Sequence, residues 1–202
     1  AAAVREELGS RPYLATLPAT DPAIVALELP AATLMDKEAW APLAAAAGLA
    51  VPPTEVFESR AALLAAADRL AYPAIAKPSL KRFTATRLAK PADAARLPDV
   101  AARILVQPFL DDQLHGVIGL AWRGEIVAAA QLRYERVWPY PCGTMSSAVT
   151  VVPDERLLAG LASVLAGFDG IFHADLAGSY LLDLNPRIHA ALPLAEAAGA
   201  RL

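Results

Sequence analysis

The chain lacks the features of a secreted, membrane-spanning or nucleic-acid-binding protein. One cysteine among 202 residues cannot build a disulfide framework or a zinc cluster, and it is typical of a reducing cytoplasm. Charges and prolines interrupt every apolar run before it reaches the length of a membrane span, and residues 1–10 have no apolar signal-peptide core. The 18 basic residues do not exceed the 21 acidic ones, as they do in most nucleic-acid-binding proteins. We therefore expect neither nucleic acid nor a membrane as a partner.

Apolar residues are abundant, at 56 %, and predict a substantial core. The length suits one sizeable domain or two small lobes. Residues 1–35 are rich in proline and are expected to be a linker or the tail of a preceding domain, and "AIVALEL" at 23–29 fits either a helix or a strand. The abrupt ends suggest a piece of a longer protein.

The first half of the remaining chain predicts helices mixed with short strands. Asp36 is a candidate N-cap, Gly48 a C-terminal stop and Ser59 a second N-cap. Helices are expected at 36–49, 59–71 and 91–97, and extended segments at 51–57, 73–79, 83–89 and 102–110.

The second half predicts an antiparallel sheet. Two strands within 114–137 are joined at Arg123-Gly124, which is a hairpin signal. The further expected elements are a strand at 143–152, a helix at 154–168, two strands within 170–186 around Ala177-Gly178-Ser179, and a closing helix at 192–202.

An acidic pair lies on the last two expected strands. Asp175 and Asp183 can face each other across such a hairpin, and Asn185 projects from the same face as Asp183. Paired carboxylates repel unless a cation lies between them, and their oxygens together with an amide oxygen suit Mg²⁺. The alternative is a polar, solvent-facing strand edge, which the leucines around Asp183 disfavour.

Three further signals are weaker when each is taken alone. Lys77 ends an apolar strand and either reaches phosphate oxygens or is simply solvated, and the same two interpretations apply to Lys37 at a helix start. The segment "ILVQPFL" at 104–110 is either a hinge that contacts an adenine or part of the core.

The order of these motifs resembles the ATP-grasp superfamily of carboxylate–amine ligases, in particular its carbamoyl-phosphate-synthetase-like and D-aspartate-ligase-like branch. "YPAIAKPS" and above all "LLDLNPR" carry the resemblance, which covers residues 36–202. It implies an α+β fold of two lobes, a small one at 36–105 and a large one at 106–202. The large lobe would have an antiparallel sheet and a metal site, and the nucleotide would bind between the lobes.

The resemblance also implies roles for individual residues. Asp175, Asp183 and Asn185 would bind Mg²⁺ or Mn²⁺, and Arg187, with Arg136 as a weaker match, would steady the transferred phosphate. The residues implied to contact ATP are Lys37, Lys77, Gln107, Phe109, Asp112, His115 and Leu181. The implied reaction activates a carboxylate as an acyl phosphate and joins it to an amine, with an amino acid or a peptide as the expected substrate. A homodimer is compatible with the resemblance.

Two departures from the family pattern keep alternatives open. The family more often has glutamate at the position of Asp183, and the loop 78–89 has no glycine, whereas the family often has a glycine-rich flap there. Lys81, Arg82, Thr84 and Thr86 would have to cover the phosphates instead, or the loop is merely solvated. The alternatives are an ATP-grasp kinase and a non-catalytic ATP-binding regulatory domain.

Three other side chains that could do chemistry receive structural roles. His173 shares a strand face with Asp175, and we expect it and His189 to be structural or to line the pocket. Cys142 has no evident base beside it and is expected to be an ordinary loop thiol.

Overall fold

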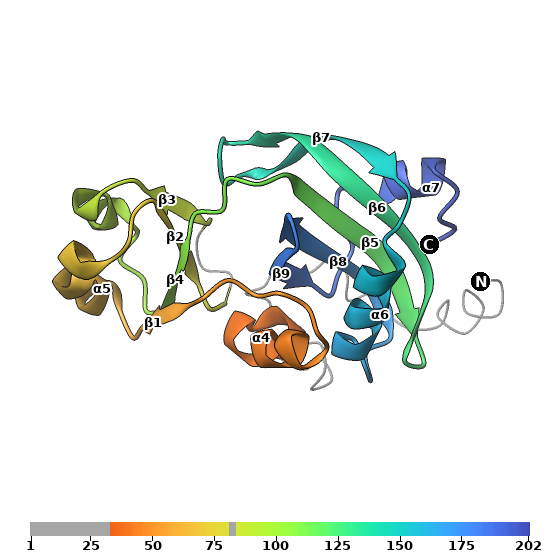
Figure 1. Ribbon diagram of the computed structural model, residues 1–202, viewed down its shortest axis with the longest axis horizontal. Helices are drawn as coiled ribbons and strands as arrows, with labels where there is room; N and C mark the ends of the chain where they lie inside the picture. Colours follow the sequence, from red (N-terminus) through yellow and green to blue (C-terminus); the bar gives the residue numbers. More distant parts are fainter. Residues whose placement is uncertain (1–32, 81–83) are drawn as a thin grey trace. The chain divides into compact units, whose positions relative to one another are not determined.

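A computed structural model describes residues 33–80 and 84–202. It confirms the expected α+β class, with two antiparallel sheets and a few helices (Figure 1). Two compact units are present. The first unit extends to Val51 and continues through Gln113–Tyr134 and Ala148–Leu202, and the second comprises Pro52–Asp112 and Glu135–Ser147. The segment 23–29 and residues Lys81 and Arg82 lie outside the described residues.

A five-stranded sheet of order β7-β6-β5-β8-β9 forms the first unit's framework. The hairpin expected at Arg123-Gly124 is confirmed, since both residues have the positive φ that such a turn requires, 52° and 83°. The strands are β5 (Leu114–Trp122), β6 (Glu125–Trp138), β7 (Thr144–Val151), β8 (Gly170–Ala177) and β9 (Tyr180–Asn185).

Two helices cover one face of this sheet, α4 (Lys37–Ala46) and α6 (Glu155–Val164) (Figure 1). The N-cap expected at Asp36 is present, since Asp36 accepts from the N–H of Glu38. At the start of α6, Asp154 accepts from two N–H groups and caps that helix as well. The short helix α7 (Leu192–Ala197) closes the chain. The shared core includes Trp40, Leu161, Phe172, Leu181 and Leu184.

A β-bulge shapes the last strand. The pairing of β8 with β9 shifts register after Asp175, so that Leu176 pairs with Leu181 while Asp175 pairs with Asp183. A bulge inserts one extra residue, and so Leu181 and Leu184, an odd number of positions apart, both reach the core.

The second unit is built on a four-stranded sheet of order β1-β4-β2-β3. The N-cap expected at Ser59 is confirmed, because its hydroxyl accepts from the N–H of Ala62. The helix is α5 (Arg60–Ala66), and the strands are β1 (Glu55–Phe57), β2 (Ala74–Pro78), β3 (Thr86–Leu88) and β4 (Ile104–Pro108). The segment expected as a helix at 91–97 is a 3₁₀ helix, Pro91–Arg96.

Asp93 anchors this 3₁₀ helix. One carboxylate oxygen accepts from the N–H groups of Ala89 and Lys90, at 2.7 and 3.2 Å, and the other accepts from Arg96 at 2.6 Å. These backbone hydrogen bonds, with a contribution from Arg96, lower the pKa of Asp93. Its charged form therefore stabilises the fold.

Replacing Asp93 with asparagine is expected to lower the urea midpoint of unfolding at neutral pH. Because the pKa is lowered in the folded state, the stabilisation is present above the unfolded-state pKa of about 3.9 and is lost as pH falls through the folded pKa. The gap between wild type and variant should shrink in acid, when followed by circular dichroism across pH. Asp99→Asn, at an exposed site nearby in sequence, is the control. A gap that stays constant with pH would contradict this account.

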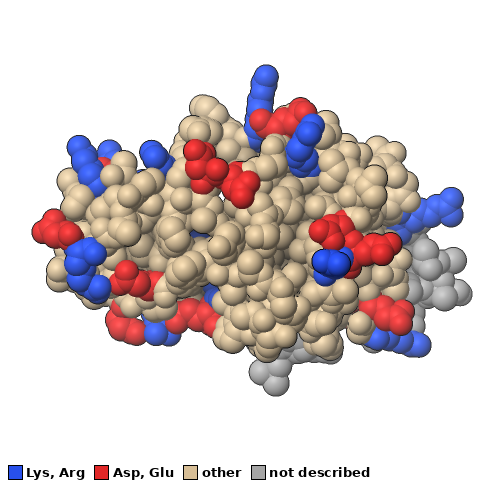
Figure 2. Space-filling model, in the orientation of Figure 1, with Lys and Arg blue, Asp and Glu red and all other residues tan. Residues whose placement is uncertain are grey.

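The surface mixes both signs of charge. On the face shown in Figure 2, basic and acidic side chains alternate instead of gathering by sign. Among the described residues, no helix is long and apolar enough to span a bilayer.

Candidate functional site

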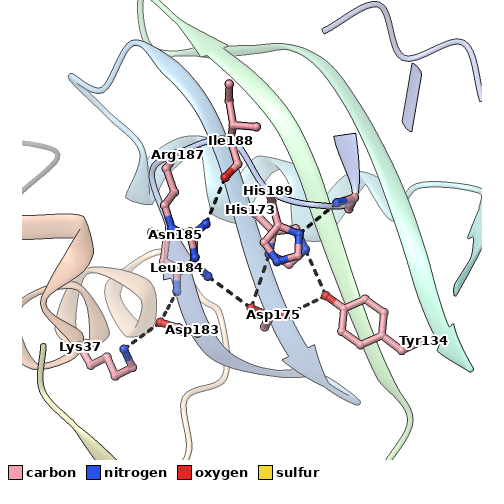
Figure 3. Close-up of polar contacts among 11 residues, drawn as sticks. Lys37, Tyr134, His173, Asp175, Asp183, Leu184, Asn185, Arg187, Ile188 and His189 are labelled. Carbon is pink, nitrogen blue, oxygen red and sulfur yellow. Dashed lines mark hydrogen bonds and ion pairs between the residues drawn. The ribbon is translucent and has the colours of Figure 1, made fainter. Parts of the chain in front are cut away.

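The predicted metal ligands meet on β8 and β9 of the first unit. Asp175 pairs directly with Asp183, and His173 pairs with Asn185, which confirms that the two carboxylates face each other in register (Figure 3). Residues paired in this way have adjacent side chains. The hairpin thus gathers two carboxylates and an amide at the end of the sheet.

Asp183 is bound by a lysine. Lys37, the first residue of α4, places its ammonium 3.0 Å from Asp183 Oδ1 (Figure 3). The lysine side chain is only 6 % exposed and the aspartate 22 %. The same oxygen accepts the backbone N–H of Leu184 at 3.0 Å. The structure therefore places Lys37, a predicted ATP contact, against a predicted metal ligand.

Asp175 is held by three different groups. The Tyr134 hydroxyl donates to Oδ1 at 2.6 Å, the Asn185 amide donates to Oδ2 at 3.3 Å, and His173 Nδ1 lies 3.5 Å from Oδ2. Burial acts to raise the pKa of Asp175, but His173, the hydrogen bond from Tyr134 and the more distant His189 outweigh it and hold the pKa well below its usual range. The carboxylate is therefore ionised at neutral pH and suited to a cation.

A glycine gives Tyr134 its access to Asp175. Tyr134 is on β6, Asp175 is on β8, and Gly116 lies on β5 between these strands. A Cβ built on Gly116 would lie within van der Waals overlap of the Tyr134 hydroxyl, and 3.0 Å from His173 Nε2. Burial, reinforced by Asp175, raises the pKa of Tyr134, so this hydroxyl keeps its proton and remains a donor.

Arg187 and a stacked pair of histidines complete the cluster. Arg187 donates to the side-chain oxygen of Asn185 at 3.3 Å and to the carbonyl of Ile188 at 3.1 Å. The rings of His173 and His189 stack with centroids 3.7 Å apart and planes 9° apart, and His173 is fully buried. The structural role expected for these histidines is consistent with this packing.

The oxygen atoms of this cluster could supply part of the coordination shell of a hard cation. Among residues 33–80 and 84–202, no group of three or more His, Cys, Asp and Glu side chains is arranged to hold a metal ion. Asp175, Asp183 and Asn185 nevertheless offer oxygen atoms, and Mg²⁺ usually takes one or two carboxylates and completes its shell with substrate phosphates and water. These residues fit Mg²⁺ bound together with a phosphorylated ligand.

Two predicted ATP contacts of the first unit are engaged elsewhere. His115 uses both ring nitrogens, one with the Gly178 carbonyl at 2.5 Å and one with Gln131 at 3.3 Å. Leu181 is fully buried in the core shared with α4 and α6. The contacts with ATP that the resemblance implies for these two residues stay predictions.

The other predicted contacts belong to the second unit. Lys77 is buried on β2, the Gln107 amide donates to the Thr54 hydroxyl at 2.8 Å, and the guanidinium of Arg87 lies 4.8 Å from the centre of the Phe109 ring. Asp112 and Arg136 are exposed.

Cys142 lies in the second unit and is partly buried. Burial raises its pKa, although Arg87 partly offsets this effect. A raised pKa leaves less thiolate at neutral pH, which agrees with the expectation of an ordinary loop thiol.

Sequence reasoning missed Tyr134 and Gly116. A glycine inside a strand pattern signals close approach of another group, and Gly116 in "LHGVIGL" gives that signal. Tyr134 gives none, because its partner is two strands away in the sheet.

No family model and no curated protein matches the chain. Solved structures do match. An L-amino acid ligase from Bacillus licheniformis is 18 % identical, with a TM-score of 0.61 over 94 % of this chain and 53 % of that one. The biotin carboxylase domain of a Hydrogenobacter thermophilus 2-oxoglutarate carboxylase, in complex with MgADP and bicarbonate, is 12 % identical, with a TM-score of 0.63 over 82 % of this chain and 42 % of that one.

The ATP-grasp ligase PsnB, complexed with a minimal precursor, is also similar, at 12 % identity and a TM-score of 0.52 over 79 % of this chain and 54 % of that one. The chain spans roughly half the length of these three proteins. At these identities the likeness shows the fold alone.

Proposed function

We propose that this chain, which has the ATP-grasp fold, is the ATP-binding part of an ATP- and Mg²⁺-dependent ligase that joins a carboxylate to an amine. One observation carries the proposal: Asp175 pairs in register with Asp183, with Asn185, Arg187 and Lys37 bound to them or to each other. A cluster with two carboxylates and two strong cations suits phosphate and metal together.

Asp175, Asp183 and Asn185 would hold the metal. Bound there, Mg²⁺ or Mn²⁺ would neutralise charge on the phosphates of ATP. Tyr134 fixes the orientation of the Asp175 carboxylate and Arg187 fixes the Asn185 amide, so the oxygens are held in place before a ligand arrives. Arg187 would also lie near enough to steady a transferred phosphate.

The proposed reaction has two steps. A carboxylate oxygen attacks the γ-phosphorus of ATP, which forms an acyl phosphate and releases ADP. The amine then attacks the acyl carbon, which forms an amide and releases inorganic phosphate and a proton. Attack by an anion on a phosphate brings negative charges together, and arginine and lysine side chains stabilise that charge in the transition state.

We further propose amino acids or peptides as substrates. The solved L-amino acid ligase supports that class by its name, although this chain matches about half of it. The additional ATP contacts proposed are Lys37, Lys77, Gln107, Phe109, Asp112, His115 and Leu181, with Arg136 near the phosphate. A cytoplasmic location would supply both ATP and the reducing conditions that suit Cys142.

The test is calorimetric titration of ATP into the chain with Mg²⁺ and with EDTA. We expect binding at least about tenfold tighter with Mg²⁺, because the cation bridges carboxylates and phosphates that otherwise repel. A screen of amino acids for ADP release, with hydroxylamine present to trap an acyl phosphate as a hydroxamate, then tests the chemistry.

Each outcome separates the alternatives. Metal-dependent binding with hydroxamate formation supports the ligase. A stable phosphorylated product that no amine displaces supports a kinase. Metal-independent binding without turnover supports a non-catalytic ATP-binding domain, and no ATP binding contradicts the proposal.

A further inference from the structure

Lys37 is a buried cation whose charge is matched by one carboxylate. Its side chain is 6 % exposed, and its ammonium lies 3.0 Å from Asp183 Oδ1. Taking an ammonium out of water is costly unless an anion compensates it. Lys37 begins α4, whose start is fixed by the Asp36 cap and whose Trp40 and Ala44 are buried in the core. The helix therefore holds the lysine stem against β9.

The two carboxylates are held in different ways. Asp175 receives hydrogen bonds from the uncharged Tyr134 hydroxyl and Asn185 amide, besides the nearby His173. Asp183 instead receives a full positive charge at 3.0 Å. Hydrogen bonds from neutral donors leave a carboxylate able to accept a cation, whereas a bound ammonium already neutralises it.

A divalent ion and this ammonium would compete for the same oxygen. Asp183 Oδ1 already accepts both the Lys37 ammonium and the Leu184 N–H. Because the lysine is attached to the same chain, its effective concentration at Asp183 is high whatever the salt concentration. Metal binding at Asp183 would thus include the free energy of displacing Lys37.

We propose that Lys37 is an internal counter-cation of Asp183, which a divalent ion must displace in order to bind. The inference rests on the metal site of the proposed function and deepens it. Displacement leaves the ammonium without its anion beside the phosphates that arrive with the metal. A lysine freed in this way would be neutralised by those phosphates, so metal and nucleotide would each favour binding of the other.

The test uses Mn²⁺ alone, titrated without nucleotide and followed by electron paramagnetic resonance. Lys37→Met removes the charge and replaces the lysine stem with another unbranched, apolar side chain. We expect this variant to bind Mn²⁺ more tightly than wild type, by about tenfold or more. Lys37→Arg keeps the charge and should stay within about threefold of wild type. In an Asp183→Asn background, Lys37→Met should have no effect.

Lys37→Met leaves the Asp183 carboxylate without its cation and could unfold the chain, so a second variant and a second measurement are needed. Lys37→Gln, which can still donate a hydrogen bond to Asp183, is the second variant, and circular dichroism shows whether each is folded. Mn²⁺ should raise the melting temperature of either variant more than that of wild type, because at the same concentration a ligand that binds the folded state more tightly stabilises it more.

Equal Mn²⁺ affinity in wild type and Lys37→Met would overturn the inference. So would the same gain in the Asp183→Asn background, because it would show a general charge effect and no competition at this oxygen. The proposed function fails separately, through absence of ATP binding in calorimetry, whereas the Mn²⁺ titration needs no nucleotide.

Discussion

Asp175→Asn is expected to weaken binding of MgATP by about 100-fold or more, because loss of even an outer-shell partner of a metal ligand typically costs about 10–100-fold. The change removes one negative charge and almost no volume. Tyr134 can still donate to the amide oxygen, so the hydrogen bond that spans β6 to β8 is kept. What is lost is the ionised oxygen that the lowered pKa of Asp175 maintains at neutral pH. Binding of ATP in EDTA should change far less.

Calorimetry with and without Mg²⁺ measures this difference directly. Asp99→Asn carries the same change of charge at an exposed position and should bind MgATP as wild type does. If Asp175→Asn kept its Mg²⁺-dependent affinity, Asp175 would not be a metal ligand and the proposed role of the β8–β9 hairpin would have to be abandoned.

Local sequence signals predicted most of the fold. Asp36 and Ser59 cap the helices they precede, and Arg123-Gly124 makes the expected hairpin turn. These features depend on contacts within a few residues, so a single sequence contains what is needed to recognise them. The turn at Ala177-Gly178-Ser179 was predictable for the same reason, but it does not by itself set the pairing of the two aspartates. Continued from the turn, the register would pair Asp175 with Leu182, and the bulge shifts it by one residue to Asp183.

The partners of the site residues were less predictable. Lys37 is 146 positions from Asp183 in the sequence, and only the packing of α4 beside β9 brings them together. The bulge after Asp175 was not predicted either, although it determines that Asp175 pairs with Asp183 and not with Leu182. Both features result from tertiary packing, and no local pattern around "LLDLNP" encodes them.

A hydrogen bond that crosses a neighbouring strand is hardest to predict. Tyr134 reaches Asp175 because Gly116 has no side chain at the crossing point. The alternation of side chains along β6 predicts on which face of the sheet Tyr134 lies. Its hydrogen-bond partner depends in addition on the length of the tyrosine side chain and on the space left by Gly116. A strand glycine near a catalytic motif is therefore a signal worth weighing in such sequences.

Gly116→Ala is expected to destabilise the chain by about 1–3 kcal/mol, the usual cost of forcing an extra methyl group into a packed interior. Gly116 does not have a positive φ, so the cost comes from contacts and not from the backbone. The new Cβ would overlap the Tyr134 hydroxyl and press on the Ala174 carbonyl and on His173 Nε2, each 3.0 Å away. Urea unfolding measures the change.

The Tyr134 contact can be isolated by a double-mutant cycle. Tyr134→Phe removes the hydroxyl that the methyl group would strike, at a cost of roughly 1–3 kcal/mol for the lost hydrogen bond to a charged group. If that overlap dominates, Gly116→Ala should cost less in the phenylalanine background, with a coupling of roughly 0.5–3 kcal/mol.

Gly160→Ala is the matched control, since the three atoms nearest to the added Cβ all belong to the flexible side chain of Leu49 and alanine favours the helix α6. It should be far milder than Gly116→Ala. Strict additivity of Gly116→Ala and Tyr134→Phe would mean that the Ala174 carbonyl and His173 set the cost, and that the gap at Gly116 does not exist to admit the tyrosine. The opposite result would be coupling between the two changes together with weaker MgATP binding in each single variant. It would show that the space at Gly116 serves to orient Asp175, because both changes take the Tyr134 hydroxyl away from Asp175 Oδ1.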